Sequence, residues 1–385
     1  MAVKEITISR CQADEVGDLR RFIDEYWRRG HILARDEALL RWQYDPRRGR
    51  QADWPGPTVL VAKEDRRIVG MLGLILAEMN VRGRALPGAW LAVWLSLPEV
   101  RKHGVGLKLL DAAWNLAGCE AVFVIGINEQ VKRIYAGLGY EILDEVPRYV
   151  AVGDPKPAAA LMLSVDANAD ADSVEVHCDE IAVHENQDRE GNQQVEAVAH
   201  PGLFDADWDA AWAERFAPTL IGTNRDSTYL NWRYVNHPSF DYERRVARDA
   251  RSGELHGLAV FRVEQIRGRE ERVLRIVEFL ATPEGGPPLA GAVTEAMRRH
   301  DVAFADFYCT CEKMAAPLEA VGFRVESHEA GRPVLPCRLQ PLEGGVFKMM
   351  GAIRLAEEWR QRGGLMVPSG DLYVTKSDGD MDRAN

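Results

Sequence analysis

One apolar stretch and the glycine-containing turn after it decide the fold of this chain. Residues 90–97 read WLAVWLSL, residues 98–106 read PEVRKHGVG, and residues 107–117 read LKLLDAAWNLA. The first stretch is almost wholly apolar, which is typical of a strand buried on both faces. The last has the spacing of an amphipathic helix, which we expect to end at Gly118.

This succession of strand, turn and helix has the ingredients of a phosphate-binding site. Gly104 and Gly106 let the backbone approach a phosphate without a Cβ in the way, and N–H groups of the first helical turn point at it. Arg101, Lys102 and His103 add positive charge beside the turn. Because a glycine pair is also simply a tight turn, the prediction depends on the neighbouring segments.

Those neighbouring segments alternate between strands and helices. Two expected strands, at residues 59–63 and 68–79, precede the apolar stretch, and another at residues 121–126 follows it. A helix containing Tyr135 comes next and leads into a strand that begins at residue 141. The pattern predicts an α/β fold in which helices flank a mixed sheet.

Two motifs in residues 1–150 resemble the GNAT superfamily of acetyl-CoA-dependent N-acetyltransferases. RKHGVG at residues 101–106 matches that superfamily's Arg/Gln-x-x-Gly-x-Gly/Ala pyrophosphate loop. NEQVKRIYAGLGY at residues 128–140 matches its second signature, a tyrosine four residues ahead of Gly-Phe/Tyr. The resemblance implies a sheet that splays open after the apolar strand, with the pantetheine arm of the cofactor in the opening.

The resemblance also implies roles for single residues. Main-chain groups at Leu97 and its neighbours would hold the pantetheine and polarise the thioester carbonyl. Asn128 would hydrogen-bond the cofactor arm, and Tyr135 would protonate the departing thiolate, although a helix residue that only packs on the strand is the alternative. The pyrophosphate would be bound by the N–H groups of Lys102, His103, Gly104, Val105, Gly106 and Leu107. The cosubstrate is then acetyl-CoA, and the acceptor is a primary amine of an amino sugar, an amino acid or a polyamine.

The sequence repeats itself at long range. RDEALLRWQY at residues 35–44 aligns with RDSTYLNWRY at residues 225–234, and LGY at residues 138–140 aligns with VGF at residues 321–323. Two anchors in the same order and at nearly the same offset indicate a domain duplication. In each copy the first anchor predicts a helix capped by its aspartate, with a tryptophan that either packs in the core or lines a substrate groove.

We therefore expect two tandem GNAT-like domains, at residues 1–151 and 203–375. Between them, residues 152–202 are predicted to be a connector with short strands, such as one at residues 173–177, and residues 376–385 to be a loose tail.

The second copy lacks the cofactor motifs. Its loop at residues 282–288 reads TPEGGPP, in which the prolines remove backbone donors, and Leu318 stands in the position of Tyr135. We expect only the first domain to bind CoA, and the second to help wall off the acceptor pocket.

A catalytic base is missing from the expected strand. Many members of the superfamily supply a Glu or Asp there, but residues 90–97 contain no carboxylate. In the second copy Glu278 interrupts the corresponding apolar stretch, and a carboxylate in such a strand is either functional or paired, with Arg275 as one candidate partner. Glu278 is therefore the candidate base.

Composition narrows the remaining possibilities. The formal net charge of −11 argues against a nucleic-acid partner and mildly favours cationic substrates such as amines. No apolar stretch is long enough to span a bilayer and no secretory signal is visible, so we expect a cytoplasmic protein, and a homodimer remains open. The six cysteines are scattered, so we expect Cys309 and Cys311 to be core residues and no metal to be bound.

Two other functions stay open on the sequence alone. One is a non-catalytic acyl-CoA-binding or interaction protein, which the missing carboxylate favours and Tyr135 opposes. The other is a transferase of a longer acyl chain or an aminoacyl group.

Overall fold

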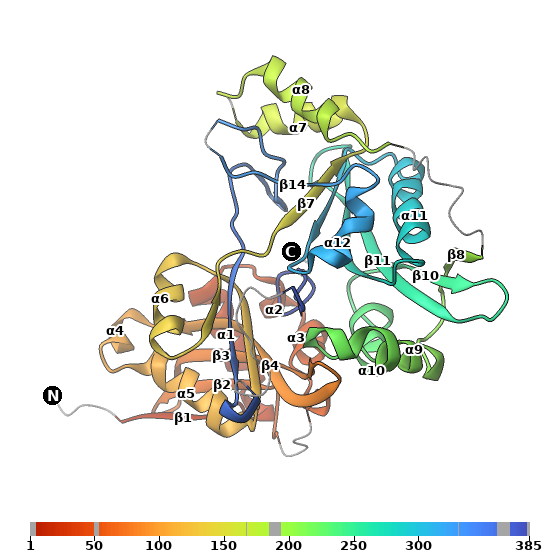
Figure 1. Ribbon diagram of the computed structural model, residues 1–385. Coiled ribbons are helices and arrows are strands. Elements are labelled where there is room, and N and C mark those ends of the chain that lie inside the picture. Colours follow the sequence, from red (N-terminus) through yellow and green to blue (C-terminus); the bar gives the residue numbers. More distant parts are fainter. Residues whose placement is uncertain are drawn as a thin grey trace.

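Two large mixed sheets with helices packed against them make up the computed structural model, which describes residues 5–49, 54–166, 168–184, 194–329, 331–359 and 370–382. In Figure 1 the sheet of the first half lies at the lower left and that of the second half at the right. The expected α/β fold of mixed sheets flanked by helices is confirmed.

The first sheet contains the strands predicted from apolar alternation. Its main path, in order, is β1 (Ile6–Arg10), β2 (Val59–Glu64), β3 (Arg67–Val81), β4 (Arg84–Ser96), β5 (Ala121–Ile127), β17 (Met350–Leu355) and β6 (Glu141–Leu143). β4 and β5 are parallel, whereas the other neighbours along this path are antiparallel.

The second sheet repeats this arrangement. Its order is β8 (Val195–Ala199), β10 (Glu243–Asp249), β11 (Leu255–Gln265), β12 (Arg272–Ala281), β13 (Phe304–Tyr308), β7 (Arg148–Val152) and β14 (Arg324–Val325). Again one pair, β12 and β13, is parallel and the others are antiparallel. Equal order and equal directions in both sheets support the duplication inferred from the repeats.

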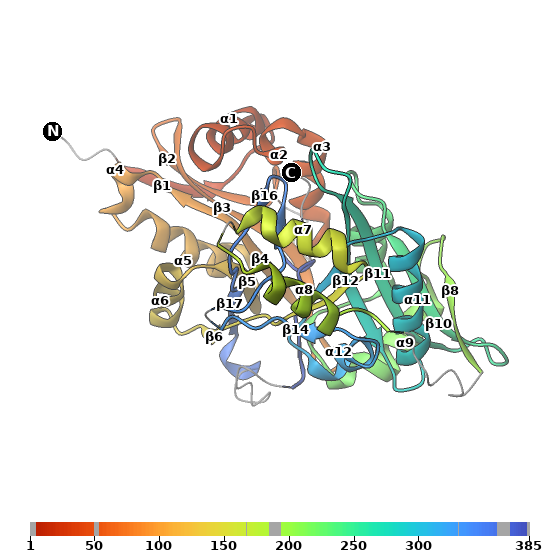
Figure 2. The same cartoon turned by 90° about the horizontal axis from the view of Figure 1, so that it is seen from above.

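The second half gives three strands to the first sheet, namely β17, β9 (Ile221–Thr223) and β18 (Leu372–Tyr373), and the first half gives β7 to the second sheet. β17, from the last part of the chain, lies between β5 and β6, as Figure 2 shows, and β7 lies between β13 and β14. The expected domain boundary at residue 151 therefore falls inside a strand of the second sheet. The extents of the two domains remain a prediction, amended by these exchanged strands.

Both copies of the Arg-Asp anchor begin a helix as predicted. The Asp36 carboxylate accepts the Leu39 N–H at 3.0 Å at the start of α3 (Glu37–Gln43). The Asp226 carboxylate likewise accepts the Tyr229 N–H at 2.8 Å at the start of α10 (Ser227–Leu230).

The repeated tryptophans pack against each other. The rings of Trp42 and Trp232 stack with centroids 4.7 Å apart, and each indole N–H donates to the backbone carbonyl of the other residue at 3.3 Å. Such reciprocal contacts are what a local two-fold relation between two copies produces. Of the two alternatives for these residues, the packing role is the one that this geometry supports.

The predicted connector contains one short strand, β8, but helices where the example at residues 173–177 was expected. α7 (Pro155–Val165) is followed by α8 (Ala171–Glu180), which includes the wrongly predicted strand at residues 173–177. The buried residues of α8, Val174 and Cys178, are four residues apart and so share one helix face, and the Asp170 carboxylate caps its start by accepting the Ser173 N–H at 2.9 Å.

The prediction of a loose tail is wrong for residues 376–382. The preceding β18 (Leu372–Tyr373) pairs with β9 (Ile221–Thr223), and the carboxylates of Asp378 and Asp382 are buried in ion pairs. Residues 383–385 lie outside the described residues. The polar composition of this segment cannot show that arginines distant in the sequence form ion pairs with its carboxylates.

Smaller predictions can also be compared with the structure. Cys309 and Cys311 are buried, as expected of core residues, and all six cysteines are free thiols. Within the described ranges, no cluster of His, Cys, Asp or Glu side chains is arranged to hold a metal, and no helix has the length and apolarity that crossing a membrane requires.

Candidate functional site

The predicted opening lies between β4 and β5. The two strands pair over three residues each and separate after the pair Trp90 and Phe123. Beyond that point β4 bulges, because Val93 adopts a φ of 52° and the register against β3 shifts. A bulge bends and twists its strand, so β4 turns away from β5 and leaves backbone groups along the opening without a strand partner.

The backbone of Leu97 is not available for the role expected of it. Its N–H donates to the Val69 carbonyl at 2.9 Å, and its own carbonyl accepts the Val100 N–H at 3.1 Å. Since alternate residues of an antiparallel strand direct their backbone groups to opposite sides, the N–H of Ser96 points toward the opening. Of the predicted main-chain groups at Leu97 and its neighbours, the N–H of Ser96 is therefore the one that faces the opening, and its role in cofactor binding stays a prediction.

The glycine turn joins α4 (Pro98–Arg101) to α5 (Val105–Ala117). Gly104 has a left-handed φ of 68°, and a Cβ built on it would meet nothing within 4 Å, so this face of the turn is open. The N–H groups of Lys102 and His103 bond to the Val100 carbonyl, and that of Gly104 bonds to the Arg101 carbonyl. These three donors, which the sequence assigned to the pyrophosphate, are used inside the turn.

The remaining predicted donors are free. The N–H groups of Val105, Gly106 and Leu107 make no hydrogen bond to any described residue, as first-turn positions of a helix require. They lie at the positive end of the α5 dipole, and the exposed side chains of Lys102 and His103 stand just before them. We call these three N–H groups the anion seat.

Trp94 connects the anion seat to the predicted acid. A Cβ on Gly106 would lie 3.0 Å from Cζ2 of Trp94, so the indole packs under the start of α5. Its buried ring N–H has no hydrogen-bond partner among the described residues. On the other side, the ring of Tyr135 lies 6.0 Å from that of Trp94 and 4.9 Å from that of Tyr140, between centroids.

Tyr135 shows the packing expected of the structural alternative, and its role as the acid stays a prediction. It comes from α6 (Glu129–Gly137) and is 1% exposed, so it does pack on the strand. Burial also raises the pKa of its phenol above the ordinary value, which keeps the hydroxyl protonated at neutral pH, as a proton donor must be. Asn128 caps the same helix by accepting the Val131 N–H at 3.0 Å, and its amide NH₂ stays without a partner among the described residues.

Residues 34–143 match the family model described as an acetyltransferase (GNAT) domain. The chain contains a GNAT domain. No curated protein matches the chain by sequence. The family supports N-acyl transfer from an acyl-CoA to an amine as the class of reaction.

Similar solved structures share the fold of both halves. A probable N-acyltransferase from Enterococcus faecalis is 14% identical, with 92% of this chain and 73% of that chain covered and a TM-score of 0.53. A GCN5-related N-acetyltransferase from Anabaena variabilis is 11% identical, with 92% and 74% covered and a TM-score of 0.55. Yeast N-myristoyltransferase with bound myristoyl-CoA is 8% identical, with 92% and 83% covered and a TM-score of 0.50. At these identities the likeness shows the fold alone.

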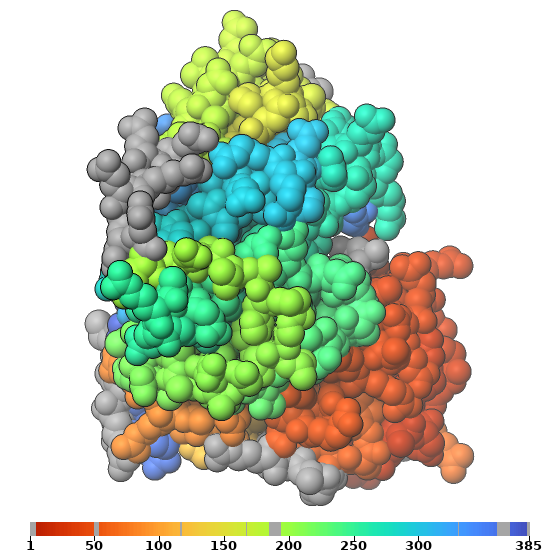
Figure 3. All heavy atoms as spheres, turned by 90° about the vertical axis from the view of Figure 1, so that its right-hand side faces the viewer, coloured from red at the N-terminus to blue at the C-terminus, as the bar shows by residue number. Residues whose placement is uncertain are grey.

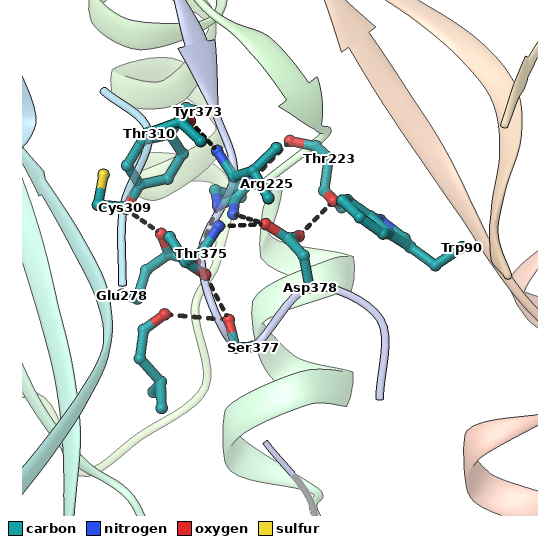
Figure 4. Close-up of polar contacts among 12 residues, drawn as sticks. Trp90, Thr223, Arg225, Glu278, Cys309, Thr310, Tyr373, Thr375, Ser377 and Asp378 are labelled. Atoms are coloured by element: carbon teal, nitrogen blue, oxygen red, sulfur yellow. Dashed lines mark hydrogen bonds and ion pairs between the residues drawn. The ribbon is translucent and has the colours of Figure 1, made fainter. Parts of the chain in front are cut away.

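Glu278 does not sit where a base for the GNAT domain could act. Its side chain is fully buried near Arg225 and Tyr373 (Figure 4). It accepts hydrogen bonds from Arg225 at 2.8 Å, from the hydroxyl of Tyr234 at 2.9 Å and from the hydroxyl of Tyr373. Burial raises the pKa of this carboxyl. The suggested partner, Arg275, binds Glu264 and Asp306 instead. Because no surface of Glu278 is open to an acceptor, we assign it a structural role and correct the catalytic prediction.

The corresponding opening of the second sheet is filled by the end of the chain. β12 and β13 pair no further than Ile276 and Phe307. Past that point, the Phe279 N–H donates to the Tyr373 hydroxyl at 3.1 Å, and the Ser377 hydroxyl donates to the Val277 carbonyl at 3.0 Å. The space that corresponds to the pantetheine cleft is thus occupied by Tyr373 and Ser377. This supports the expectation that only the first copy binds CoA.

A cavity of about 520 Å³ is lined by residues of both halves. Gly126, on β5 beyond its last pair with β4, lines it, as do Arg262 and Arg275 of the second half and Lys376 of the final segment. Figure 3 shows a hollow at its right edge between the red-orange first half and the teal second half. Sequence reasoning named Arg275 only as a partner of Glu278 and placed none of these residues in a cavity, although charged side chains at positions 262 and 275 inside apolar strands were a signal.

Proposed function

We propose that this chain is an N-acyltransferase whose GNAT domain takes an acetyl group from acetyl-CoA and transfers it to a primary amine of a small molecule. One observation carries the proposal: the anion seat and Tyr135 lie on two sides of Trp94, at the opening between β4 and β5. We assign the approach of the amine to the cavity lined by Gly126, a residue of β5 that lies beyond its last pair with β4.

The donor fits the residues that surround the opening. The anion seat binds the diphosphate, since a helix start contributes roughly 0.3–1 kcal/mol per anion, and Lys102 and His103 add charge. The amides of the pantetheine arm pair with backbone groups along the opening, such as the N–H of Ser96, as an added strand would. The free amide NH₂ of Asn128 is the further donor that we assign to this arm.

The reaction needs one bond formed, one broken and two proton movements. The amine nitrogen attacks the thioester carbonyl carbon, so that a C–N bond forms and the C–S bond breaks. The nitrogen releases one proton to solvent, and the departing sulfur takes one proton from the Tyr135 hydroxyl, which solvent then restores. A positioned acid of this kind contributes roughly 10²–10⁴ in rate.

Gly104→Glu should weaken acetyl-CoA binding by about 100-fold or more, because a carboxylate beside the anion seat repels the diphosphate. Calorimetry gives the affinity, and thermal melting reports the added strain of a left-handed glutamate, which costs roughly 1–2 kcal/mol. Gly17→Glu is the matched control, because Gly17 is exposed on a helix of the same half with no atom within 4 Å of its Cβ. Wild-type affinity in the Gly104 variant would refute the assigned site.

Thiol release from acetyl-CoA over a panel of amines separates an enzyme from a binder. We expect release with at least one amine. Tight acetyl-CoA binding without release on any amine would favour a non-catalytic acyl-CoA-binding protein.

A further inference from the structure

The cavity between the two halves has a charge opposite to that of the whole chain. Five cationic and three acidic side chains line it, in a protein whose formal net charge is −11; they are Arg28, Arg262, Arg275, Arg338, Lys376, Glu264, Glu343 and Asp382. A cavity of about 520 Å³ has the size of small-molecule sites, which run roughly from 300 to 1,000 Å³.

The three carboxylates in the cavity are already neutralised. Glu264 pairs with Arg275 at 2.7 Å and Arg262 at 3.0 Å. Asp382 pairs with Arg262 at 2.8 Å, and Arg338 pairs with Glu343 at 2.9 Å in the same wall. These acids therefore have little capacity left to attract a cationic ligand.

Two cations in the cavity have no such partner. Lys376 makes neither a hydrogen bond nor an ion pair with any described residue, and its Nζ lies 5.0 Å from the centre of the Tyr308 ring. Burial, and then the neighbouring Arg275, lowers the pKa of this lysine to about 8, which still leaves it mainly charged at neutral pH. Arg28, exposed at the rim, likewise forms no ion pair within the described ranges.

We propose that this cavity is the acceptor site and that it selects an amine which also carries an anionic group, a carboxylate or a phosphate. The anion binds between Lys376 and Arg28, and the amine end extends toward Gly126 and the opening of the GNAT domain. The ammonium of Lys376 has three N–H donors that no described residue accepts. An anionic group of the ligand can accept charge-assisted hydrogen bonds from them. A polyamine would instead add charge to a wall that already holds an excess of cations. The identification of the ligand as the acyl acceptor rests on the proposed function. The preference for an anionic group does not, because it follows from the charges of the cavity.

The test uses pairs of amines that differ only in the anionic group. Glucosamine 6-phosphate is compared with glucosamine, and β-alanine with its amide, by calorimetry on the full chain without a donor. In at least one pair we expect the anionic member to bind about tenfold tighter or more, which is the gain that a charge-assisted hydrogen bond provides. The pair that shows this difference tells whether the cavity prefers a phosphate or a carboxylate. Equal affinities within both pairs would overturn the proposal.

Variants place the preference in the cavity. Lys376→Met should remove most of the difference between pair members while the acetyl-CoA affinity stays unchanged, because the anion seat is untouched. Arg28→Met, on the exposed rim where folding is not at risk, should reduce the difference several-fold. Lys156→Met removes the same charge from the surface of α7, outside the cavity lining, and should change nothing. A preference that survives both cavity substitutions would contradict the assignment.

The experiments distinguish a failure of the anion preference from a failure of the proposed function. If the protein neither binds acetyl-CoA nor releases thiol, the acyltransferase proposal fails while the matched pairs still report on the cavity. If thiol release is seen but favours the uncharged members, the enzyme stands and the anion selectivity is refuted.

Discussion

Replacing Arg225 with methionine should lower the free energy of unfolding by about 3–5 kcal/mol, the usual cost of removing one partner from a buried ion pair. Arg225 is fully buried, and its guanidinium donates to Glu278 and to Asp378, each at 2.8 Å. Without it, two carboxylates remain in the interior with no cation between them. Because Asp378 also accepts from Thr223, which in turn accepts the Trp90 indole N–H, the loss extends to the contact between the two halves (Figure 4).

Urea denaturation followed by circular dichroism measures this effect. Arg41→Met is the matched control, since Arg41 pairs with Glu37 at 2.8 Å on the surface, where an ion pair contributes roughly 0.2–1 kcal/mol. An unpaired buried carboxyl has a folded-state pKa above its unfolded value, so the Arg225 variant should regain part of its stability as the pH is lowered. Equal losses in the two variants would show that Glu278 and Asp378 do not depend on this arginine.

Tyr135→Phe should lower kcat by roughly 10²–10⁴ and leave the affinity for acetyl-CoA unchanged. Phenylalanine keeps the ring contacts to Trp94 and Tyr140 and removes only the hydroxyl that we assign to the leaving sulfur. Burial raises the pKa of this phenol above the ordinary tyrosine value of about 10. Ionisation of Tyr135 should therefore cause no loss of the wild-type rate at any pH up to about 10.

Steady-state thiol release over a pH series tests this prediction. Tyr140→Phe is the control, because it removes a neighbouring hydroxyl from the same aromatic cluster and should leave kcat unchanged. If Tyr135 only packs on the strand, its phenylalanine variant will turn over like the wild type, and the assignment of the acid will have to be abandoned.

Local sequence patterns predicted the parts of the site that depend on local structure. The apolar run at residues 90–97, the glycine turn and the amphipathic helix that ends at Gly118 all form as expected, because their periodicity and end signals act within a few residues. The same holds for the aspartate caps of the two repeated anchors, whose hydrogen bonds span three residues.

Long-range pairing could not be predicted in this way. The segment RYVAV of β7 reads as a strand, but nothing in its period shows that it joins the second sheet while β17 joins the first. The polar segment around Asp378 and Asp382 looked loose because its partners, Arg225 and Arg262, are more than a hundred residues away. For the same reason, the sequence of an acidic protein could not predict that cationic side chains gather in one cavity.

A crystal structure of the protein with CoA bound tests the central claim most directly. We predict that diphosphate oxygens lie about 2.7–3.2 Å from the backbone nitrogens of Val105, Gly106 and Leu107, with the thiol in the opening between β4 and β5 beside the Tyr135 hydroxyl. CoA bound in the second sheet's opening, or a turn at Gly104 that stays closed by its own side chains with the cofactor elsewhere, would contradict it.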